Sequence, residues 1–220
     1  ATGPVPPGGK IFDIRKVRLK NFRYRMNNFD KELYPHTGKG INFEDLDVTV
    51  SELRGHSLKM AGGVMSGTCD FAAMKEKSGF NVHCISGKAS VGQGKTLVED
   101  LHIIDDYSDI RLAHYKMSYR WGGDFAQFIS KVLIDAKLRR SSVAMKSISY
   151  FSKGVFDHSP SVFDIRKGSF RGYVNDFTVT GIDFSDKGTG VSGKVQTCTL
   201  TGIPDIADSY LSTKIGNLSF

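Results

Sequence analysis

The feature that most constrains this chain is a strand pattern whose phase repeatedly slips by one residue. Val17 and Leu19 alternate with basic residues, and the apolar alternation then resumes at Phe22 with the opposite parity. Side chains in a strand point alternately to the two faces of a sheet, so such a slip would turn the apolar set outward. A bulge or bend at the slip returns the set to one face. The pattern predicts a long, bent strand with one apolar face.

The same slip recurs along the chain. The apolar sets that change parity are Val17 and Leu19 before Phe22, Tyr24 and Met26; Ile41 and Phe43 before Leu46, Val48 and Val50; Val143 and Met145 before Ile148 and Tyr150; and Phe177 and Val179 before Ile182 and Phe184. The chain also has 24 glycines and 15 phenylalanines, which suit strands joined by tight turns. We therefore predict an all-β fold with a long, curved, antiparallel sheet and one continuous apolar face.

Strand-like segments fill most of the sequence. They lie at 11–26, 41–54, 56–62, 66–75, 79–85, 95–104, 109–121, 141–151, 161–171, 173–185, 189–200 and 209–219. Turn signals between them are Gly38-Lys39-Gly40, Gly62-Gly63, Gly92-Gln93-Gly94 and Asp186-Lys187-Gly188. This density excludes a βαβ layout and favours a meander or a Greek key. We expect residues 1–10 to be a linker at the edge of an excised piece of a longer protein, and 11–220 to form a single β-rich domain.

One segment has the period of a helix instead. Its apolar residues at helical spacing are Phe125, Phe128, Ile129, Val132, Leu133 and Ala136. Asp124, with Gln127 three residues later, is a plausible variant of a capping box. We expect one short amphipathic helix that packs on the sheet or closes the end of a groove. Lys and Arg do not dominate its polar side, which disfavours a helix lying on a lipid surface.

The charge pattern bears on partners. A net charge of +7 admits nucleic acid or an anionic membrane surface. The basic residues alternate with apolar ones, however, which is typical of a solvated sheet face. The densest run, from Arg15 to Arg25, lies in a predicted strand and is explained by protection of a sheet edge. The sequence has no recognisable nucleic-acid motif, so we expect no nucleic-acid partner.

The sequence has few residues in patterns typical of reactive chemistry. Asp100, His102, Asp105 and Asp106 lie close in sequence, but Leu101 and Ile103 alternate with them as core residues, and the pair 105–106 is better explained by a turn. We therefore predict no metal site, no cofactor and no catalytic residues. Cys69 and Cys84 would pair only if their strands are neighbours; the alternative is three small buried cysteines, with Cys198.

Two further patterns have structural explanations. Tyr115, Met117, Tyr119 and Trp121 form a stripe with period two, which is typical of core packing or of a groove wall. The segments 44–48, 99–103 and 175–179 share an acid or amide, Asp, an apolar residue, a polar residue and a β-branched residue. Their unequal spacing argues against a solenoid and for repeated use of one strand-entry design.

Three segments taken in order resemble a known family. They read Ser141-Ser142-Val143-Ala144-Met145-Lys146-Ser147-Ile148-Ser149-Tyr150-Phe151, Phe170-Arg171-Gly172-Tyr173-Val174-Asn175-Asp176-Phe177, and Leu200-Thr201-Gly202-Ile203-Pro204-Asp205-Ile206. This order is similar to that in the Bacteroidetes branch of the TamB-like, AsmA-related translocation and assembly module proteins, and the likeness extends from about Ile11 to Phe220. The order of the three segments, more than any single motif, is what makes the likeness specific.

The resemblance implies a fold, a place and a function. Such proteins are long periplasmic β-structures of Gram-negative cells, anchored in the inner membrane, with sheets that curl into a taco-shaped gutter with an apolar lining. They are implicated in lipid transport and outer-membrane biogenesis, including assembly of outer-membrane proteins. For this chain it implies a periplasmic, non-catalytic segment tethered through a part of the protein that the sequence does not include. The implied partners are phospholipid or another acyl-chain lipid, and outer-membrane β-barrel assembly proteins.

We therefore predict that acyl chains lie along an apolar β-groove. The residues expected to line it are Val17, Leu19, Phe22, Tyr24, Leu46, Val48, Val50, Leu101, Ile103, Tyr115, Met117, Tyr119, Phe177 and Val179. One alternative is a structural module with a closed apolar core that binds partners by β-strand augmentation. The other is a carbohydrate-active β-sandwich with two carboxylates beside Trp121.

Overall fold

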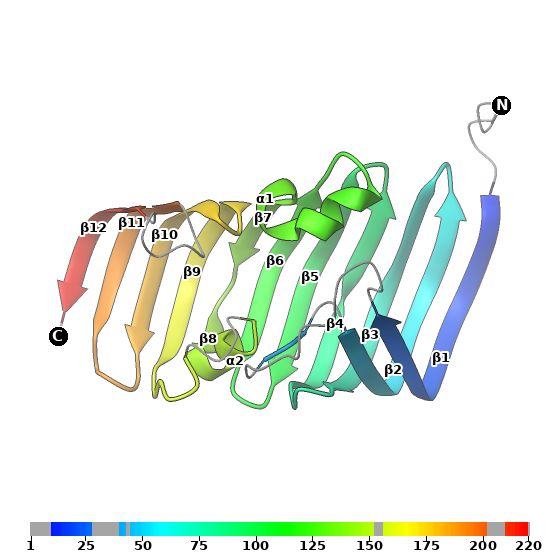
Figure 1. The fold of residues 1–220 in the computed structure, drawn as a ribbon, viewed down its shortest axis with the longest axis horizontal. Coiled ribbons are helices and arrows are strands. Elements are labelled where there is room, and N and C mark those ends of the chain that lie inside the picture. The colour runs from blue at the N-terminus through cyan, green and yellow to red at the C-terminus, as the bar shows by residue number, and fades with distance from the viewer. Residues whose placement is uncertain (1–9, 28–39, 43–44, 152–155, 202–209, 220) are drawn as a thin grey trace.

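The computed structural model describes residues 10–27, 40–42, 45–151, 156–201 and 210–219, which form one antiparallel sheet (Figure 1). Its strands are β1 (Lys10–Asn27), β2 (Asp45–Ala61), β3 (Val64–Glu76), β4 (Asn81–Gly92), β5 (Lys95–Asp105), β6 (Asp109–Ser118), β7 (Leu133–Leu138), β8 (Ser141–Ala144), β9 (Val162–Tyr173), β10 (Asp176–Asp186), β11 (Ser192–Thr201) and β12 (Tyr210–Ser219). They lie side by side in chain order, except that β7 and β8 occupy successive parts of one position between β6 and β9. The predicted all-β class is confirmed.

The predicted slips near residues 20 and 180 are bends within continuous strands. In β1, Leu19 lies opposite Leu53 and Phe22 lies opposite Val50, with Asn21 between them at φ +52°. In β10, Gly181 at φ +61° separates Val179 from Ile182. Figure 1 shows the result at its lower right, where β1 and β2 bend and part of each stands in front of the sheet.

The bends coincide with left-handed backbone. Within the described residues, Asn21, Ser57 and Asp100 are the non-glycine positions with positive φ, and each lies inside a strand. Residues with short polar side chains such as Asn and Asp adopt this conformation more readily than bulky or β-branched residues do. The sequence thus places tolerant residues where the apolar pattern must change phase.

The bend at Asn21 makes a testable prediction. We expect Asn21→Val to lower the free energy of unfolding by about 1–2 kcal/mol, because a β-branched side chain is strained at this positive φ. Asn21→Gly should leave it within about 0.5 kcal/mol of the parent value. Urea unfolding followed by circular dichroism measures both, and equal stability of the two variants would contradict a left-handed residue at this bend.

The prediction of two separate strands at 41–54 and 56–62 is wrong, because β2 is a single strand. It runs unbroken through Gly55, whose added Cβ would lie 2.6 Å from the carbonyl oxygen of Thr68. Glycine is needed there for a close approach between neighbouring strands, so it does not end the strand. The predicted slip after Phe43, the turn residues Gly38 and Lys39, and the linker residues 1–9 lie outside the described residues, while Lys10 already belongs to β1.

The prediction of a strand at 141–151 is wrong beyond Ala144, and so is the predicted slip there. β8 ends at Ala144, and the helix α2 (Met145–Ser149) follows it. The buried Ser147 hydroxyl donates a hydrogen bond to Oδ1 of Asp105 at 2.8 Å. The Ser108 hydroxyl lies 2.7 Å from the Ser147 hydroxyl. These bonds to the β5–β6 turn stabilise a helical turn in a segment whose local pattern favours a strand.

The helix predicted over 124–136 is also shorter than expected. The chain forms a 3₁₀ segment, η1 (Gly122–Gln127), then α1 (Phe128–Lys131), and enters β7 at Leu133. Asp124 does not cap it; its Oδ2 accepts a hydrogen bond from the Arg120 backbone N–H at 2.7 Å. Ala136 lies opposite Tyr115 and Phe170 in the sheet. Pairing with two neighbouring strands outweighs the helical spacing of this segment.

Several boundaries differ from the predicted ones, while three turns agree. β4 continues to Gly92, past the predicted end at 85, and β6 ends at Ser118, before the predicted 121. Turns lie at Gly62-Gly63, Gln93-Gly94 and Lys187–Thr189, as expected. Of the three repeated segments, those at 45 and 176 begin strands, but Asp100 lies inside β5, so the single strand-entry design is wrong there.

Candidate functional site

One face of the sheet is apolar from strand to strand. Leu19 lies opposite Leu53, which lies opposite Ala72. Ala72 in turn lies opposite Ile85, which lies opposite Ile103. Directly opposed residues point to the same face, so these five form one row from β1 to β5. We call this side of the sheet the apolar face.

A second apolar row crosses the other half of the sheet. Met117 lies opposite Ile134, Gly172 lies opposite both Ile134 and Phe177, and Leu200 lies opposite Phe177. The rings of Phe170 and Phe177 have centroids 4.7 Å apart. The apolar face therefore extends from β1 to β11.

The structure places all the predicted groove residues on this one face. Each is opposite another member of the face, except Tyr119 just beyond β6, whose hydroxyl lies 3.3 Å from that of Thr96 on the same face. They are Val17, Leu19, Phe22, Tyr24, Leu46, Val48, Val50, Leu101, Ile103, Tyr115, Met117, Tyr119, Phe177 and Val179. Their role in lipid binding stays a prediction.

Other members of the face were missed by the sequence analysis. They include Leu53, Ile85, Leu112, Ile134 and Phe170. Ile134 was hidden because its segment has helical spacing. Leu53 follows a further phase slip and Leu112 precedes another, so the parity of each differs from that of the nearest predicted residues. A residue-by-residue count of parity across every strand would have found most of them.

The middle of the apolar face is covered. Val132 is 0%, Ala136 6% and Ile134 7% exposed. Figure 1 shows η1 and α1 in front of the upper part of the sheet near β5–β7, and the Phe125 ring lies against that of Tyr119, with centroids 4.8 Å apart. Burial accordingly raises the pKa of Tyr115.

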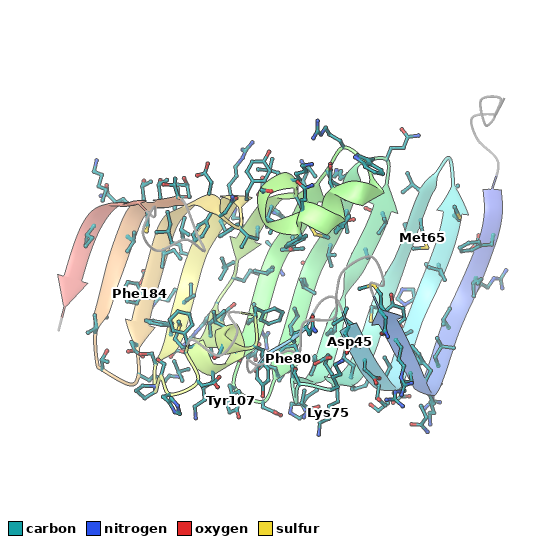
Figure 2. The ribbon with its side chains drawn as sticks, viewed as in Figure 1. Asp45, Met65, Lys75, Phe80, Tyr107 and Phe184 are labelled. Atoms are coloured by element: carbon teal, nitrogen blue, oxygen red, sulfur yellow. The ribbon has the colours of Figure 1, made fainter. Side chains whose placement is uncertain are left out.

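A second cover lies near α2. Phe80, labelled in Figure 2, has its ring centroid 5.1 Å from that of Tyr150 and 5.3 Å from that of Phe151. The backbone N–H of Ile41 also donates to the carbonyl oxygen of Tyr150 at 2.8 Å. This cluster holds the segment after α2 against the β3–β4 turn.

The β1 end of the apolar face is open to solvent. The exposed fractions there are 41% for Ile14, 46% for Leu19, 51% for Tyr24 and 39% for Met26. Within the described residues, eight hydrophobic side chains in all are buried. The apolar face is thus a closed core only in part, and it offers apolar surface along an edge strand.

The opposite face is polar and charged. Arg23 and Arg25 both pair with Asp47, and the hydrogen bond from Arg23 holds the pKa of the Asp47 carboxyl below its ordinary value. Four histidines also pair with aspartates of neighbouring strands or turns. These pairs are His56 with Asp70, His83 with Asp106, His102 with Asp109 and His114 with Asp135. The face is an ion-paired, solvated surface.

Two hairpin turns, β5–β6 and β10–β11, each begin with a buried acid at the end of the preceding strand. Asp105 accepts hydrogen bonds from the backbone N–H groups of Tyr107 and Ser108, both at 2.8 Å, which confirms the predicted turn. Asp186 accepts one from the Thr189 hydroxyl at 2.7 Å, and this bond is the main cause that lowers the pKa of its carboxyl. These acids have structural partners in the turns.

The residues considered for a metal have other partners. Asp100 pairs with Arg139 at 2.7 Å and His102 Nε2 lies 2.8 Å from Asp109 Oδ1. No three His, Cys, Asp or Glu side chains within the described residues gather closely enough to hold a metal ion. Cys69 and Cys84 are free thiols that lie opposite Gly87 and Ile104, and their strands, though adjacent, present them on opposite faces.

A small pocket of mixed polar and apolar lining lies where β6 and β7 meet the helical segment. Its volume is about 380 Å³, and it is lined by Ser118, Tyr119, Arg120, Ser130, Lys131, Leu133 and Tyr173. Trp121 ends the predicted aromatic stripe outside the sheet and is 68% exposed. The stripe therefore contributes three residues to the apolar face and one to the surface.

Among the described residues, no helix has the length and apolar character needed to cross a membrane. Comparison with protein-family models, with curated proteins and with solved structures finds no match.

Proposed function

We propose that this chain is a non-catalytic segment of an envelope-biogenesis protein that binds or conducts acyl-chain lipids, phospholipid above all, along its apolar face. The observation that favours this function is the apolar face itself. It is continuous over many strands, and at β1 four of its side chains, Ile14, Leu19, Tyr24 and Met26, are 39–51% exposed. Soluble proteins rarely leave a row of large apolar side chains open unless the surface meets a ligand or partner.

The proposed mechanism is passive. An acyl chain gains roughly 0.8 kcal/mol for each CH₂ group that it buries. A surface without specific polar contacts lets the chain slide between equivalent positions, so the direction of movement comes from elsewhere. The family resemblance adds the setting, which is the periplasm, with a tether to the inner membrane and contact with outer-membrane β-barrel assembly proteins.

The test uses acidic substitutions on the open part of the face. Leu19→Asp and Tyr24→Asp place a charge where an acyl chain would lie, yet both positions are solvent-exposed, so the sheet should persist. Protein purified gently from a Gram-negative periplasm is extracted with organic solvent, and the lipid is counted by mass spectrometry. We expect each variant to retain about tenfold less lipid than the parent, because a carboxylate is costly to bury.

The matched control is Thr49→Asp. Thr49 lies in β2 on the polar face, opposite Arg23, so it receives the same new charge on the other side of the same sheet region. It should keep the parent's lipid content. Equal lipid in all four proteins, or lipid in none, would remove the basis of the proposal.

A further inference from the structure

Among the described strands, β1 is an outer one that pairs along one side only. It is 18 residues long and pairs with β2 from Lys10 to Asn27. No other strand of the described residues pairs with it. Its outer backbone N–H and C=O groups can therefore accept another extended segment.

The charge of β1 limits which segment can bind. The strand contains seven Lys and Arg residues and one Asp. A second copy of β1 placed alongside would bring like charges together, which destabilises cross-strand pairing. Arg15 and Lys16 form no ion pair with any described residue, so they are available to an acidic partner.

β2 shows what kind of strand suits β1. On the polar face, Asp47 pairs with Arg23 and Arg25, and Glu52 accepts a hydrogen bond from Arg18 at 2.8 Å. On the apolar face, Val48 lies opposite Tyr24 and Leu46 lies opposite Met26. Acidic residues that alternate with apolar ones therefore complement both sides of β1 at once.

We infer that the outer edge of β1 binds an extended segment of a partner protein in which acidic and apolar residues alternate. The added strand would cover Leu19 and Tyr24, which are 46% and 51% exposed, and would place its acids near Arg15 and Lys16. A nucleic acid would satisfy only the charges and leave the apolar side open. This inference does not depend on lipid binding, because the strand-pairing side of β1 is defined by its backbone and its charges.

The test measures binding of a labelled synthetic peptide of about ten residues in which Glu alternates with Val and Leu. Two matched peptides serve as probes of the pattern, one with Lys in place of Glu and one with the same composition in non-alternating order. Fluorescence anisotropy gives the affinity, and amide hydrogen exchange of β1 reports the site. We expect only the alternating acidic peptide to bind and to protect β1.

Charge reversal in the protein separates a local effect from a global one. Arg15→Glu with Lys16→Glu changes β1, and Lys75→Glu with Lys95→Glu makes the same change on inner strands, where the opposed residues are uncharged. The first variant should weaken binding about tenfold or more and the second much less. Equal weakening by both, equal binding of the non-alternating peptide, or unprotected β1 amides would overturn the inference.

Discussion

Replacing Ile134 with Asp is expected to unfold most of the protein or to cost about 4 kcal/mol or more. Ile134 is 7% exposed, and it lies between Met117 and Gly172 in the covered part of the apolar face. The change removes a buried aliphatic side chain and leaves a carboxylate without a partner. Domains of this kind have only about 5–15 kcal/mol to lose. Urea unfolding followed by circular dichroism measures the loss.

Leu19→Asp is the control for this experiment. Leu19 belongs to the same face but is 46% exposed, so its substitution should cost about 1 kcal/mol or less. A large difference between the two variants would establish that the apolar face is a core at its centre and a surface at β1. If both variants unfold alike, the β1 end is covered too, and the proposed lipid surface loses its support.

Gly172→Ala is expected to lower the free energy of unfolding by about 3 kcal/mol. Gly172 has φ +145°, and an added Cβ would lie 2.4 Å from both the carbonyl oxygen of Asp176 and the Cα of Phe177. Both neighbours are backbone atoms of β10, so no side-chain rotation relieves the collision. The strand must move away, which would also separate Phe170 from Phe177.

Gly181→Ala in the adjacent strand separates the two causes of this loss, which are backbone strain and steric collision. Gly181 has φ +61°, and nothing lies within 4 Å of the position of an added Cβ. Its substitution therefore tests backbone strain without a collision and should cost about 1 kcal/mol. Thermal or urea unfolding of the two variants in parallel gives the comparison. A loss at Gly172 no larger than that at Gly181 would mean that close approach of β9 and β10 is not what requires glycine.

The sequence predicts the sheet well because its strongest signal is a two-residue period. The slip between Leu19 and Phe22 indicated a bulge or bend, and the structure has a bend there, at Asn21. The segment after Leu133 misled because its apolar residues fit both periods. Only the requirement for a strand between β6 and β9 decides between them, and that requirement is not local. The helix α2 was missed for a similar reason, since its hydrogen bonds reach a turn about 40 residues away.

The candidate site was predictable in its composition but not in its exposure. Parity along single strands correctly placed Val17 and Met117 on one face, because opposed residues preserve the face across a sheet. Parity cannot tell that Ile134 is covered and that Tyr24 is open. That difference depends on where η1, α1 and α2 pack over the sheet, and their sequences gave no reliable indication of it.

The order of the strands has a consequence for how the protein is made. Nearly every strand pairs with its neighbours in the chain, so each new hairpin needs only the strand before it as a template. Sheets of this topology close short loops and avoid most of the entropy cost of distant pairing. The sheet can therefore form progressively from either end, as stacked repeats do. By the same logic, a hairpin added or removed in evolution would alter the length of the apolar face while leaving the existing pairings intact.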